Sequence, residues 1–577
     1  MAEKFSSKGG IWRTIKKSNN TNDWKIKIGD NSTNDPSKVA NGFKDFFQSK
    51  VEGLVKSHNP TEIFSALSDK YKNIPRWDLE TCTELEVSKA IDDLKPNMSS
   101  GPDNIPGVLL KHVKFEILPL LTHIINCSIT SGQFPSAWNS GKIIPVHKSG
   151  SKTSLNNYRP ICISSVLGKV VETVVRNKFL VHLDKILPEN MYGFRKSKST
   201  QDAVTHLTDR IFELKAAGKK VAILALDASA AFDCLSHDVI LTSMQILGIG
   251  PKMIEWTKNF IKGSTQFVEI NGHRSKEYSS PVGVRQGRRI SPDFFNIGTI
   301  TAAFWTLIAE SFLYADDGVN VISADSIEEC NSKLQSVASE LARWYDMVGL
   351  ALNVKKSEVL GFGFIPNPIS VNSDTIQPSK HITFLGLTIQ SDLKWNLQVD
   401  KICNKIRAAA GRIRFEGRHF DVKDRRSLYF AWAQGCLLAN GLAYLPRLNA
   451  GDEQKIQIAC NSAIRAILRL PRFGKVQINA HRQFLNIPSV CQLKNKLIFE
   501  AAWKKNQSAV SNRLLPGPTT RARANLNITH PLQKGYLSQM IRNKCDIAWN
   551  DLPLEAKTEP SKQKAFRIIK SHCLSYM

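Results

Sequence analysis

The stretch SFLYADDGVN (residues 311–320) sets two adjacent aspartates, Asp316 and Asp317, between two apolar segments. In a regular strand consecutive side chains point to opposite faces, so the two carboxylates could not face one ligand. A tight turn between LY and VNVI, with Gly318 relieving the backbone, would bring both to one end of a β-hairpin. The sequence therefore predicts a hairpin with a carboxylate pair at its turn. Taken alone, Asp-Asp-Gly is more typical of a plain surface turn.

A third carboxylate changes that interpretation. Asp227 ends the apolar run VAILALD (221–227), which is typical of a buried central strand. Carboxylates that lie close together disfavour each other's ionisation unless a cation lies between them. Asp227, Asp316 and Asp317 can converge at strand ends into an all-oxygen site suited to Mg²⁺. Two such ions about 4 Å apart can hold the attacking and leaving oxygens of a phosphoryl transfer.

The composition points to a large basic protein. Its 577 residues exceed one compact domain, and 42% hydrophobic and 22% charged residues are typical of globular chains. Of the net charge of +27, +21 falls in residues 401–577, which hold 31 Lys and Arg against 10 Asp and Glu. Such a surplus favours a polyanionic partner, either nucleic acid or an anionic membrane surface.

Targeting signals are absent from this sequence. No run of about 18 apolar residues suits a membrane span, and the N-terminus lacks the apolar core of a signal peptide. The 11 cysteines include no C-x-x-C pair, which is typical of reduced thiols. We therefore expect an intracellular protein of the nucleus, the cytoplasm or both, not a secreted one, and no membrane partner.

Eight segments in order, over roughly residues 95–395, resemble the reverse transcriptases of non-LTR (LINE-type, jockey-like) retrotransposons. YADD (314–317) is similar to their polymerase motif, LDASAAFDCLSHDVI (226–240) to the preceding metal-binding motif, and GVRQGRRISPDFFNI (283–297) to their Gln-Gly-x-x-x-Ser-Pro segment. The other matching segments are SGPDNIP (100–106), IIPVHKSGSKTSLNNYRPI (143–161), MYGFRKSKST (191–200), GLALNVKKSEVLGF (349–362) and ITFLGLTI (382–389). Of the underlying sequence, GKIIPVHKSG (141–150) predicts a short strand that runs into a Gly/Ser turn, as in a hairpin, and HITFLGLTIQ (381–390) predicts one strand. In the tail, WNDLP (549–553) is similar to the C-terminal region of jockey-like elements.

The resemblance implies an α+β right-hand polymerase with a helical basic C-terminal extension. The expected divisions are a mostly helical, partly disordered N-terminal extension (1–94), fingers (95–220), palm (221–395), helical thumb (396–480) and basic extension (481–577). The implied activity is that of an RNA-directed DNA polymerase, a nucleotidyltransferase that adds dNTPs to a DNA primer on an RNA template. The implied cofactor is a pair of Mg²⁺ ions, or Mn²⁺ in their place.

The resemblance also assigns roles to single residues. Asp227 and Asp316 are the main metal ligands, with Asp317 as a third. Phe232 is the aromatic that excludes a 2′-hydroxyl, and Lys356 is the lysine that protonates the leaving pyrophosphate. Lys148 and Arg159 hold the incoming triphosphate, and Gln286 and Gly287 line the nucleotide and template pocket. The competing interpretations are a Phe buried behind a strand, solvated surface charge for Lys148 and Arg159, and a plain helix-surface role for Lys356. Asp233 and Asp238 are expected to cap or brace the following helix rather than to bind metal.

Three arginines depart from the family pattern. Arg285 stands where a proline is usual, and Arg288 and Arg289 stand where small or apolar residues are usual. They could grip template phosphates, or they could overfill the pocket and mark a decayed element. In the thumb, phosphate contacts are expected from Lys401, Lys405, Arg407, Arg412 and Arg414. Tryptophans 432, 503 and 549 are expected in the core.

The family's endonuclease domain is expected to be missing, since Met1 lies close to the fingers. Two other functions stay open at this point. One is an inactive nucleic-acid-binding remnant of a truncated retroelement, and the other is a maturase of the group II intron type. The intact aspartates favour the polymerase, whereas the three arginines and the missing endonuclease favour the remnant.

Overall fold

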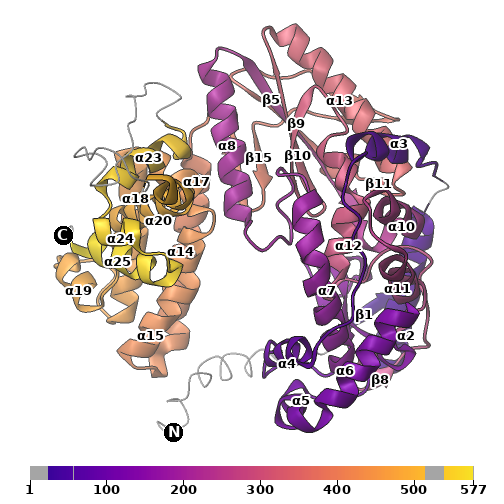
Figure 1. The fold of residues 1–577 in the computed structure, drawn as a ribbon. Helices are drawn as coiled ribbons and strands as arrows, with labels where there is room; N and C mark the ends of the chain where they lie inside the picture. Colours follow the sequence, from indigo (N-terminus) through magenta and orange to yellow (C-terminus); the bar gives the residue numbers. More distant parts are fainter. Residues whose placement is uncertain (1–23, 56–57, 514–538, 576–577) are drawn as a thin grey trace.

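The computed structural model describes residues 24–55, 58–513 and 539–575. Figure 1 shows two lobes, with the C-terminal helices in one and the preceding part of the chain in the other. The expected disorder of the N-terminal extension falls largely on residues 1–23, outside the described residues. Within the described part, that extension begins with a short hairpin, β1 (Ile26–Ile28) and β2 (Asn31–Thr33), and continues into helix α2 (Pro36–Leu54).

The central element is a four-stranded antiparallel sheet in the order β12-β5-β10-β9. Its strands are β5 (Lys220–Leu226), β9 (Ala309–Tyr314), β10 (Asp317–Ala324) and β12 (Glu358–Phe362). The predicted hairpin is confirmed as β9–β10, which are separated by two residues.

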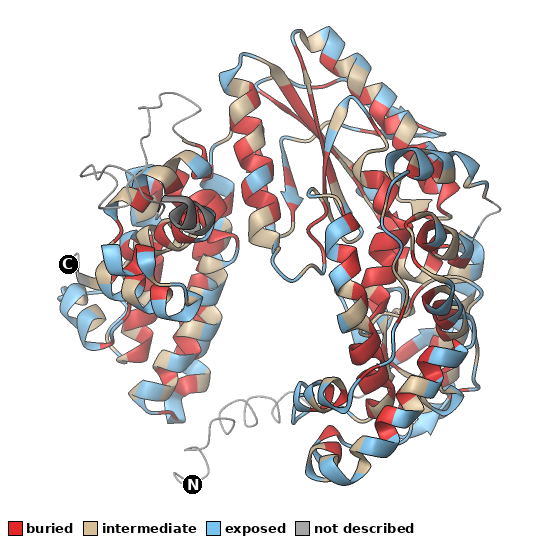
Figure 2. Ribbon diagram, viewed as in Figure 1, coloured by how far each residue is buried: buried red, intermediate tan, exposed pale blue. Residues whose placement is uncertain are grey.

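Both faces of this sheet are covered, which explains why the run VAILAL is apolar at every position. Ala222 and Leu224 enter one apolar cluster together with helix α13 (Ile327–Met347), and Val221 and Ile223 enter another together with helix α8 (Thr200–Ala216). Figure 2 shows these central strands coloured mainly as buried. Because no edge of β5 or face of the sheet is free, the residues at its end are rigidly placed.

The first cluster also contains most helices of this lobe. They are α3 (Thr61–Lys70), α4 (Glu84–Asp92), α5 (Gly107–His112), α6 (Lys114–Ser131), α7 (Val166–Ile186), α10 (His237–Ile246), α11 (Pro251–Lys262) and α12 (Ser291–Gly298). The short helix α9 (Ala231–Cys234) follows the two-residue strand β6 (Ala228–Ser229), which pairs with β11 (Ala351–Leu352).

A second sheet has four strands, in the order β4-β3-β7-β8. The predicted hairpin is confirmed, because β3 (Gly141–His147) pairs antiparallel with β4 (Tyr158–Ser164). Strand β7 (Gln266–Ile270) joins β3 in parallel and β8 (His273–Arg274) follows it. Helix α2 packs on this sheet and forms a small apolar core with it.

After the central sheet come two small hairpins. The first is β13 (Ile369–Val371) with β14 (Asp374–Ile376), and the second is β15 (His381–Phe384) with β16 (Leu387–Gln390). The segment ITFLGLTIQ was predicted as one strand, and this is wrong: Leu385 and Gly386 take positive φ values of 48° and 86° and reverse the chain.

The C-terminal lobe is helical, as predicted. Its helices are α14 (Asn396–Glu416), α15 (Val422–Tyr429), α16 (Gly435–Leu438), α17 (Gly441–Tyr444), α18 (Ala450–Ile467), α19 (Ile478–Phe484), α20 (Val490–Arg513), α23 (Ile541–Asp551), α24 (Leu554–Thr558) and α25 (Lys562–Ser575). A π-helical turn, Phe430–Gln434, joins α15 to α16. Trp503 and Trp549 are buried as predicted, whereas Trp432 is partly exposed.

One buried ionic cluster joins the two lobes. The guanidinium of Arg447 contacts Asp209 of α8 (Nη2 to Oδ1, 2.5 Å) and donates to Thr208 Oγ1 (2.7 Å). The same carboxylate accepts the backbone N–H groups of Ile541 (2.6 Å) and Arg542 (3.0 Å), at the start of α23. Asp209 therefore holds a helix N-terminus, where a negative charge is favoured. No helix in the described part of the chain has the length and apolar character needed to cross a membrane.

Candidate active site

The turn of the β9–β10 hairpin carries Asp316 and Asp317. Tyr314 pairs with Asp317, so Ala315 and Asp316 form the two-residue turn. Ala315 takes the left-handed conformation (φ 57°), so the expected relief by Gly318 is wrong. The turn is pressed against Gly193, where an added Cβ would lie 2.5 Å from the Ala315 nitrogen. A packed glycine therefore fixes the position of the carboxylate pair.

Asp227 follows β5 directly and lies at the same end of the sheet. Its neighbour Leu226 pairs with Gly318, which places Asp227 across from Asp317. Its backbone is held on both sides, since its carbonyl accepts the Asn353 N–H (2.8 Å) and its own N–H donates to Ser357 Oγ (3.3 Å). The structure therefore places the three predicted residues at one edge of the sheet.

The charges at this edge affect one another. Desolvation, together with the negative charges of Asp316 and Asp227, raises the pKa of Asp317 to about 6. Partial burial raises the pKa of Asp227; Lys356 opposes this shift, and Asp316 adds to it. Lys356 Nζ lies 3.8 Å from Asp227 Oδ2. The carboxylates are therefore crowded by like charge and partly relieved by one lysine.

This donor set suits a divalent cation. Carboxylate oxygens are the ligands that Mg²⁺ prefers, and the mutual repulsion of the three groups is what a bound cation would relieve. The side chains are not drawn together, however: no group of three His, Cys, Asp or Glu close enough to hold a metal occurs in the described residues. The chemistry of the donors fits, while a closed ligand shell is not formed.

Two cations of the second sheet face this edge. Lys148 follows β3, Arg159 lies on β4, and both are exposed. Desolvation and the positive charges of Arg159 and Lys356 lower the pKa of Lys148, while Asp227 and Asp316 act in the opposite direction. Lys148 therefore lies within the fields of both the carboxylates and the other cations, and the structure brings these predicted residues together.

Phe232 lies five residues after Asp227, on the short helix α9. Its ring stacks on Phe295 (centroids 4.3 Å apart, planes 5° apart) and meets Phe194 edge-on at 6.0 Å. The side chain is only half-buried. Stacking holds the ring in one plane while part of it stays accessible.

The loop after Gly283 runs between α9 and strand β4. Cys162 of β4 donates its N–H to the Gln286 carbonyl (2.7 Å), and Val284 donates to the Phe232 carbonyl (2.6 Å). Gly287 has φ 110°, and a Cβ there would lie 2.4 Å from the Cys162 carbonyl oxygen. Glycine is therefore required at this position for both its conformation and its close approach.

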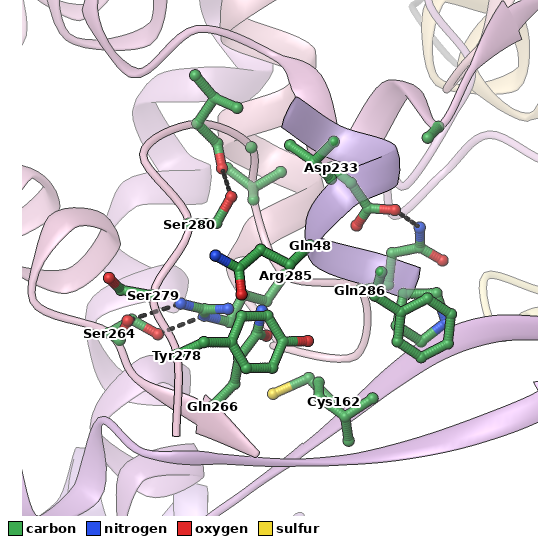
Figure 3. A pocket seen from close by; sticks show the side chains of 18 of the residues that line it. Gln48, Cys162, Asp233, Ser264, Gln266, Tyr278, Ser279, Ser280, Arg285 and Gln286 are labelled. Carbon is green, nitrogen blue, oxygen red and sulfur yellow. Dashed lines mark hydrogen bonds between the residues drawn. The ribbon is translucent and has the colours of Figure 1, made fainter. Parts of the chain in front are cut away.

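The side chain of Gln286 is held in its orientation by the carboxylate of Asp233. Its Nε2 donates to Asp233 Oδ2 (3.1 Å), and both residues line a cavity of about 80 Å³ (Figure 3). Asp233 was expected to brace the following helix; its carboxylate instead faces this cavity. In the stretch AFDC (231–234), Asp233 directly follows Phe232, and this adjacency was the available signal that Asp233 lies near the nucleotide site.

Arg285 also lines the cavity, with its side chain on Ser264. Its Nη2 donates to the Ser264 carbonyl oxygen (2.6 Å) and its Nε to the hydroxyl of the same residue (Figure 3). Tyr278 and Gln48, the latter from α2, complete this wall. The predicted phosphate contact by Arg285 is therefore not supported, because its guanidinium is engaged inside the protein.

Arg288 is a core residue, so the prediction that it grips template phosphates is wrong. It is 3% exposed, and its Nε lies 2.8 Å from Oε1 of the fully buried Glu172. Its guanidinium stacks over Phe260 at 4.4 Å, and Nη2 donates to Asn139 (3.1 Å). Glu172 was missed, although an acid inside the apolar helix VVETVV is itself a signal. Arg289 donates its backbone N–H to Glu172 Oε2 (2.7 Å).

The five predicted thumb cations all lie on α14, and they differ in surroundings. Lys405 and Arg407 are exposed. Lys401 Nζ approaches Thr388 Oγ1 (3.3 Å), Arg412 pairs with Glu416 (3.0 Å), and Arg414 donates to the Leu470 carbonyl (2.9 Å). Phosphate contact by these residues stays a prediction.

Comparison with known proteins agrees with this geometry. Residues 146–389 match the family model described as reverse transcriptase (RNA-dependent DNA polymerase). The RNA-directed DNA polymerase from mobile element jockey of Drosophila melanogaster is 26% identical, over 58% of this chain and 38% of that protein. The probable RNA-directed DNA polymerase from transposon BS of the same species is 24% identical, over 76% and 50%. A putative 115 kDa protein of its retrotransposable element R1DM is 24% identical, over 66% and 38%.

The chain thus spans half or less of the length of these curated relatives. Among solved structures, it is similar to an RNA-dependent RNA polymerase of a human picobirnavirus, with a TM-score of 0.43 and 13% identity over 86% of this chain and 90% of that one. That likeness is too slight to carry an argument. The family match covers the central sheet, strands β4, β7 and β8 of the second sheet, and all three carboxylates: the chain contains a reverse transcriptase domain, and its relatives include RNA-directed DNA polymerases of jockey and other non-LTR retrotransposons.

Proposed function

We propose that the chain is an RNA-directed DNA polymerase that adds dNTPs to the 3′ end of a DNA primer on an RNA template. The observation that carries this proposal is the meeting of Asp227, Asp316 and Asp317 at one sheet edge, opposite Lys148 and Arg159, inside the matched domain. A group of carboxylates that faces a pair of cationic side chains suits a triphosphate and the metal ions that accompany it.

In this reaction the primer 3′-oxygen forms a bond to the α-phosphorus, and the bond to the pyrophosphate oxygen breaks. Asp227, Asp316 and Asp317 would hold Mg²⁺ or Mn²⁺, which when bound supplies positive charge to the attacking and leaving oxygens. Lys148 and Arg159 neutralise the triphosphate, and Arg159 can grip two phosphate oxygens at once. Lys356, already 3.8 Å from Asp227, supplies a proton to the leaving pyrophosphate.

Selection of the nucleotide falls to two side chains. Phe232 is held flat by Phe295 and would block a 2′-hydroxyl, because an aromatic ring cannot accept that group by hydrogen bonding. Gln286, held by its hydrogen bond to Asp233, would contact the nucleotide as well. These roles rest on the family resemblance together with the positions described above.

The inactive remnant is not favoured. Part of its support came from arginines that were expected to overfill the pocket. Arg288 is neutralised by Glu172, and Arg285 is bonded to Ser264, so both are accommodated without filling the space beside the carboxylates.

Primer extension on an oligonucleotide-annealed RNA template, with and without Mg²⁺, tests the proposal. Asp227→Asn and Asp316→Asn should lower incorporation by at least about 10³-fold, as expected when electrostatic stabilisation of the transition state is removed. Asp374→Asn, an exposed carboxylate on β14, is the matched control and should extend normally.

Thermal unfolding separates lost chemistry from lost folding. Because the carboxylates repel one another, the Asn variants should melt at the same temperature as the unsubstituted protein or higher. Chelation of Mg²⁺ should stop extension by the unsubstituted protein. Extension that persists in the Asp227 and Asp316 variants would contradict the proposal.

A further inference from the structure

A second cavity, of about 390 Å³, lies in the C-terminal lobe, away from the carboxylates. It is formed by α15, the π-helical turn Phe430–Gln434, α20 and α25, which gather in that lobe in Figure 1. A volume of this size is sufficient for a small ligand such as a nucleotide. No role in polymerisation has been assigned to it.

The lining is positively charged. Arg426, Lys496 and Lys570 face the cavity, and no Asp or Glu is among its lining residues. Glu500 lies outside it and contacts Lys496 (3.3 Å), so the net charge of the wall remains positive. Lys570 is exposed. These features favour an anionic ligand.

The π-helical turn supplies the other contacts. Turns of this kind are rare in proteins, and many of those that occur lie at functional sites. Here the turn directs Phe430 and Gln434 into the cavity, with the Arg426 guanidinium 4.7 Å from the Phe430 ring centroid. Gln434 Oε1 is buried and has no hydrogen-bond partner among the described residues. The guanidinium of Arg426 is already engaged, because it donates to the backbone carbonyls of Leu485 and Asn486. The aromatic ring, the unused amide oxygen and the two lysines match the base and phosphate of a nucleotide.

The surroundings indicate a strand, not a free nucleotide. Between Glu453 and Glu500 the chain has eight Lys or Arg and no acidic residue. Phe484, two residues before the lining residue Asn486, is 76% exposed. A basic surface with exposed aromatics beside a pocket is the usual arrangement for binding single strands, whose bases are free to stack.

We propose that this cavity binds one unpaired nucleotide of a single-stranded RNA. The phosphate would contact Lys570 and Lys496, the base would stack on Phe430, and Gln434 Oε1 would accept a hydrogen bond from a base amino or imino group. The choice of RNA rests on the proposed function, since its template is the strand with unpaired stretches. Binding itself requires no polymerisation.

Fluorescence anisotropy with a labelled 12-nucleotide single-stranded RNA, without dNTPs or Mg²⁺, tests the inference. Lys570→Glu should weaken binding on the order of tenfold, because it reverses a charge in the cavity. Lys564→Glu is the matched control: it lies on the same helix, is exposed and makes the same charge change outside the cavity. It should alter binding less than about threefold.

Gln434→Ala tests the base contact without risk to folding, since its Oε1 has no partner to lose. It should weaken binding of the single strand by about threefold to tenfold and leave binding of a paired RNA of equal length unchanged. Equal losses with Lys570→Glu and Lys564→Glu would overturn the cavity as the site. If a mononucleotide displaces the labelled RNA as tightly as the unlabelled oligonucleotide does, the ligand is a free nucleotide and not a strand. If single-stranded DNA binds equally well and loses the same affinity in the variants, the choice of RNA is wrong.

The binding assay is independent of primer extension. A protein that extends primers but shows no difference between the two lysine variants would retain the proposed function and lose this site. A protein that shows the difference but extends nothing would retain this site and lose the proposed function.

Discussion

At the scale of single residues, Arg288 shows how a charge is carried inside this protein. Its guanidinium meets Glu172, lies over Phe260 and donates to Asn139, so charge, ring face and amide all contribute. A buried pair of this kind is costly to break on one side, because the remaining charge has no water to solvate it.

Replacing Arg288 alone should therefore be severe. We expect Arg288→Met to lower the free energy of unfolding by about 3–5 kcal/mol, since Glu172 would be left buried and unpaired. The double variant Glu172→Gln/Arg288→Met should recover most of the loss, and urea unfolding of both variants measures it. Additive losses would show that the two side chains are not coupled.

Asp233 gives a pH dependence of stability. Burial raises the pKa of Asp233 to about 7, with Lys50 and Arg285 opposing the shift. The folded protein then holds this proton more tightly than the unfolded chain, whose aspartates titrate near about 4. Its contribution to stability therefore falls as the pH rises from about 4 to about 7.

Asp233→Asn removes that titration and keeps the shape of the side chain. The urea midpoint of the unsubstituted protein should fall further between pH 5 and pH 8 than that of the variant. If the two proteins lose the same amount, the proton on Asp233 does not affect stability. A raised KM for dNTPs in the variant, with kcat little changed, would also indicate that Asp233 positions Gln286.

At the scale of elements, the β9–β10 hairpin depends on a neighbour far away in the sequence. Gly193 leaves no space for a side chain beside the Ala315 nitrogen. We expect Gly193→Ala to displace the turn and lower primer extension on the order of 10²-fold, the usual effect of about 1 Å of misplacement. Gly53→Ala, where an added Cβ meets no atom within 4 Å, is the control and should extend normally.

The same hairpin shows which structural features could be predicted from the sequence. Alternation and the adjacent aspartates predicted the turn, the strands and both carboxylates. They did not identify Ala315 as the left-handed residue, because that conformation is imposed by the register of the strands and by contact with Gly193. Likewise, Leu385 and Gly386 divide a stretch that reads as one strand, and only the pairing of its halves reveals the turn.

Ion pairs between residues far apart in the sequence were the main feature that the sequence did not predict. Arg288 and Glu172 are 116 positions apart, and comparison with the family pattern described the arginine as a phosphate contact or a defect. The three aspartates could be found because each ends a strand or lies in a turn, which are local signals. Asp233 carried a local signal too, but its partner Gln286 comes from another element.

At the scale of the whole molecule, the cluster around Asp209 links the two lobes. Asp209→Ala would leave Arg447 buried without its partner and would remove the acceptor for the first N–H groups of α23. We expect a loss of about 3–5 kcal/mol in the free energy of unfolding. In this variant, the amide hydrogens of residues 541–551 should exchange faster than in the unsubstituted protein, with smaller changes in the rest of the chain.

Asp546→Ala provides the comparison for that experiment. Asp546 is also in α23 and pairs with the partly exposed Lys505 (2.7 Å), a surface ion pair worth no more than about 1 kcal/mol. Faster exchange in α23 for both variants alike would show that the Asp209 cluster has no special part in holding the helix.

The position of this cluster along the chain also bears on biosynthesis. Asp209 leaves the ribosome more than 300 residues before Ile541, the backbone group it accepts. During that interval, at roughly 5–20 residues per second, the polymerase core can fold while the docking site for α23 stays vacant. Closure of the cluster therefore waits until residues 541 and 542 have been made, and a chain that stops before them leaves Asp209 paired with Arg447 but without the backbone donors of α23.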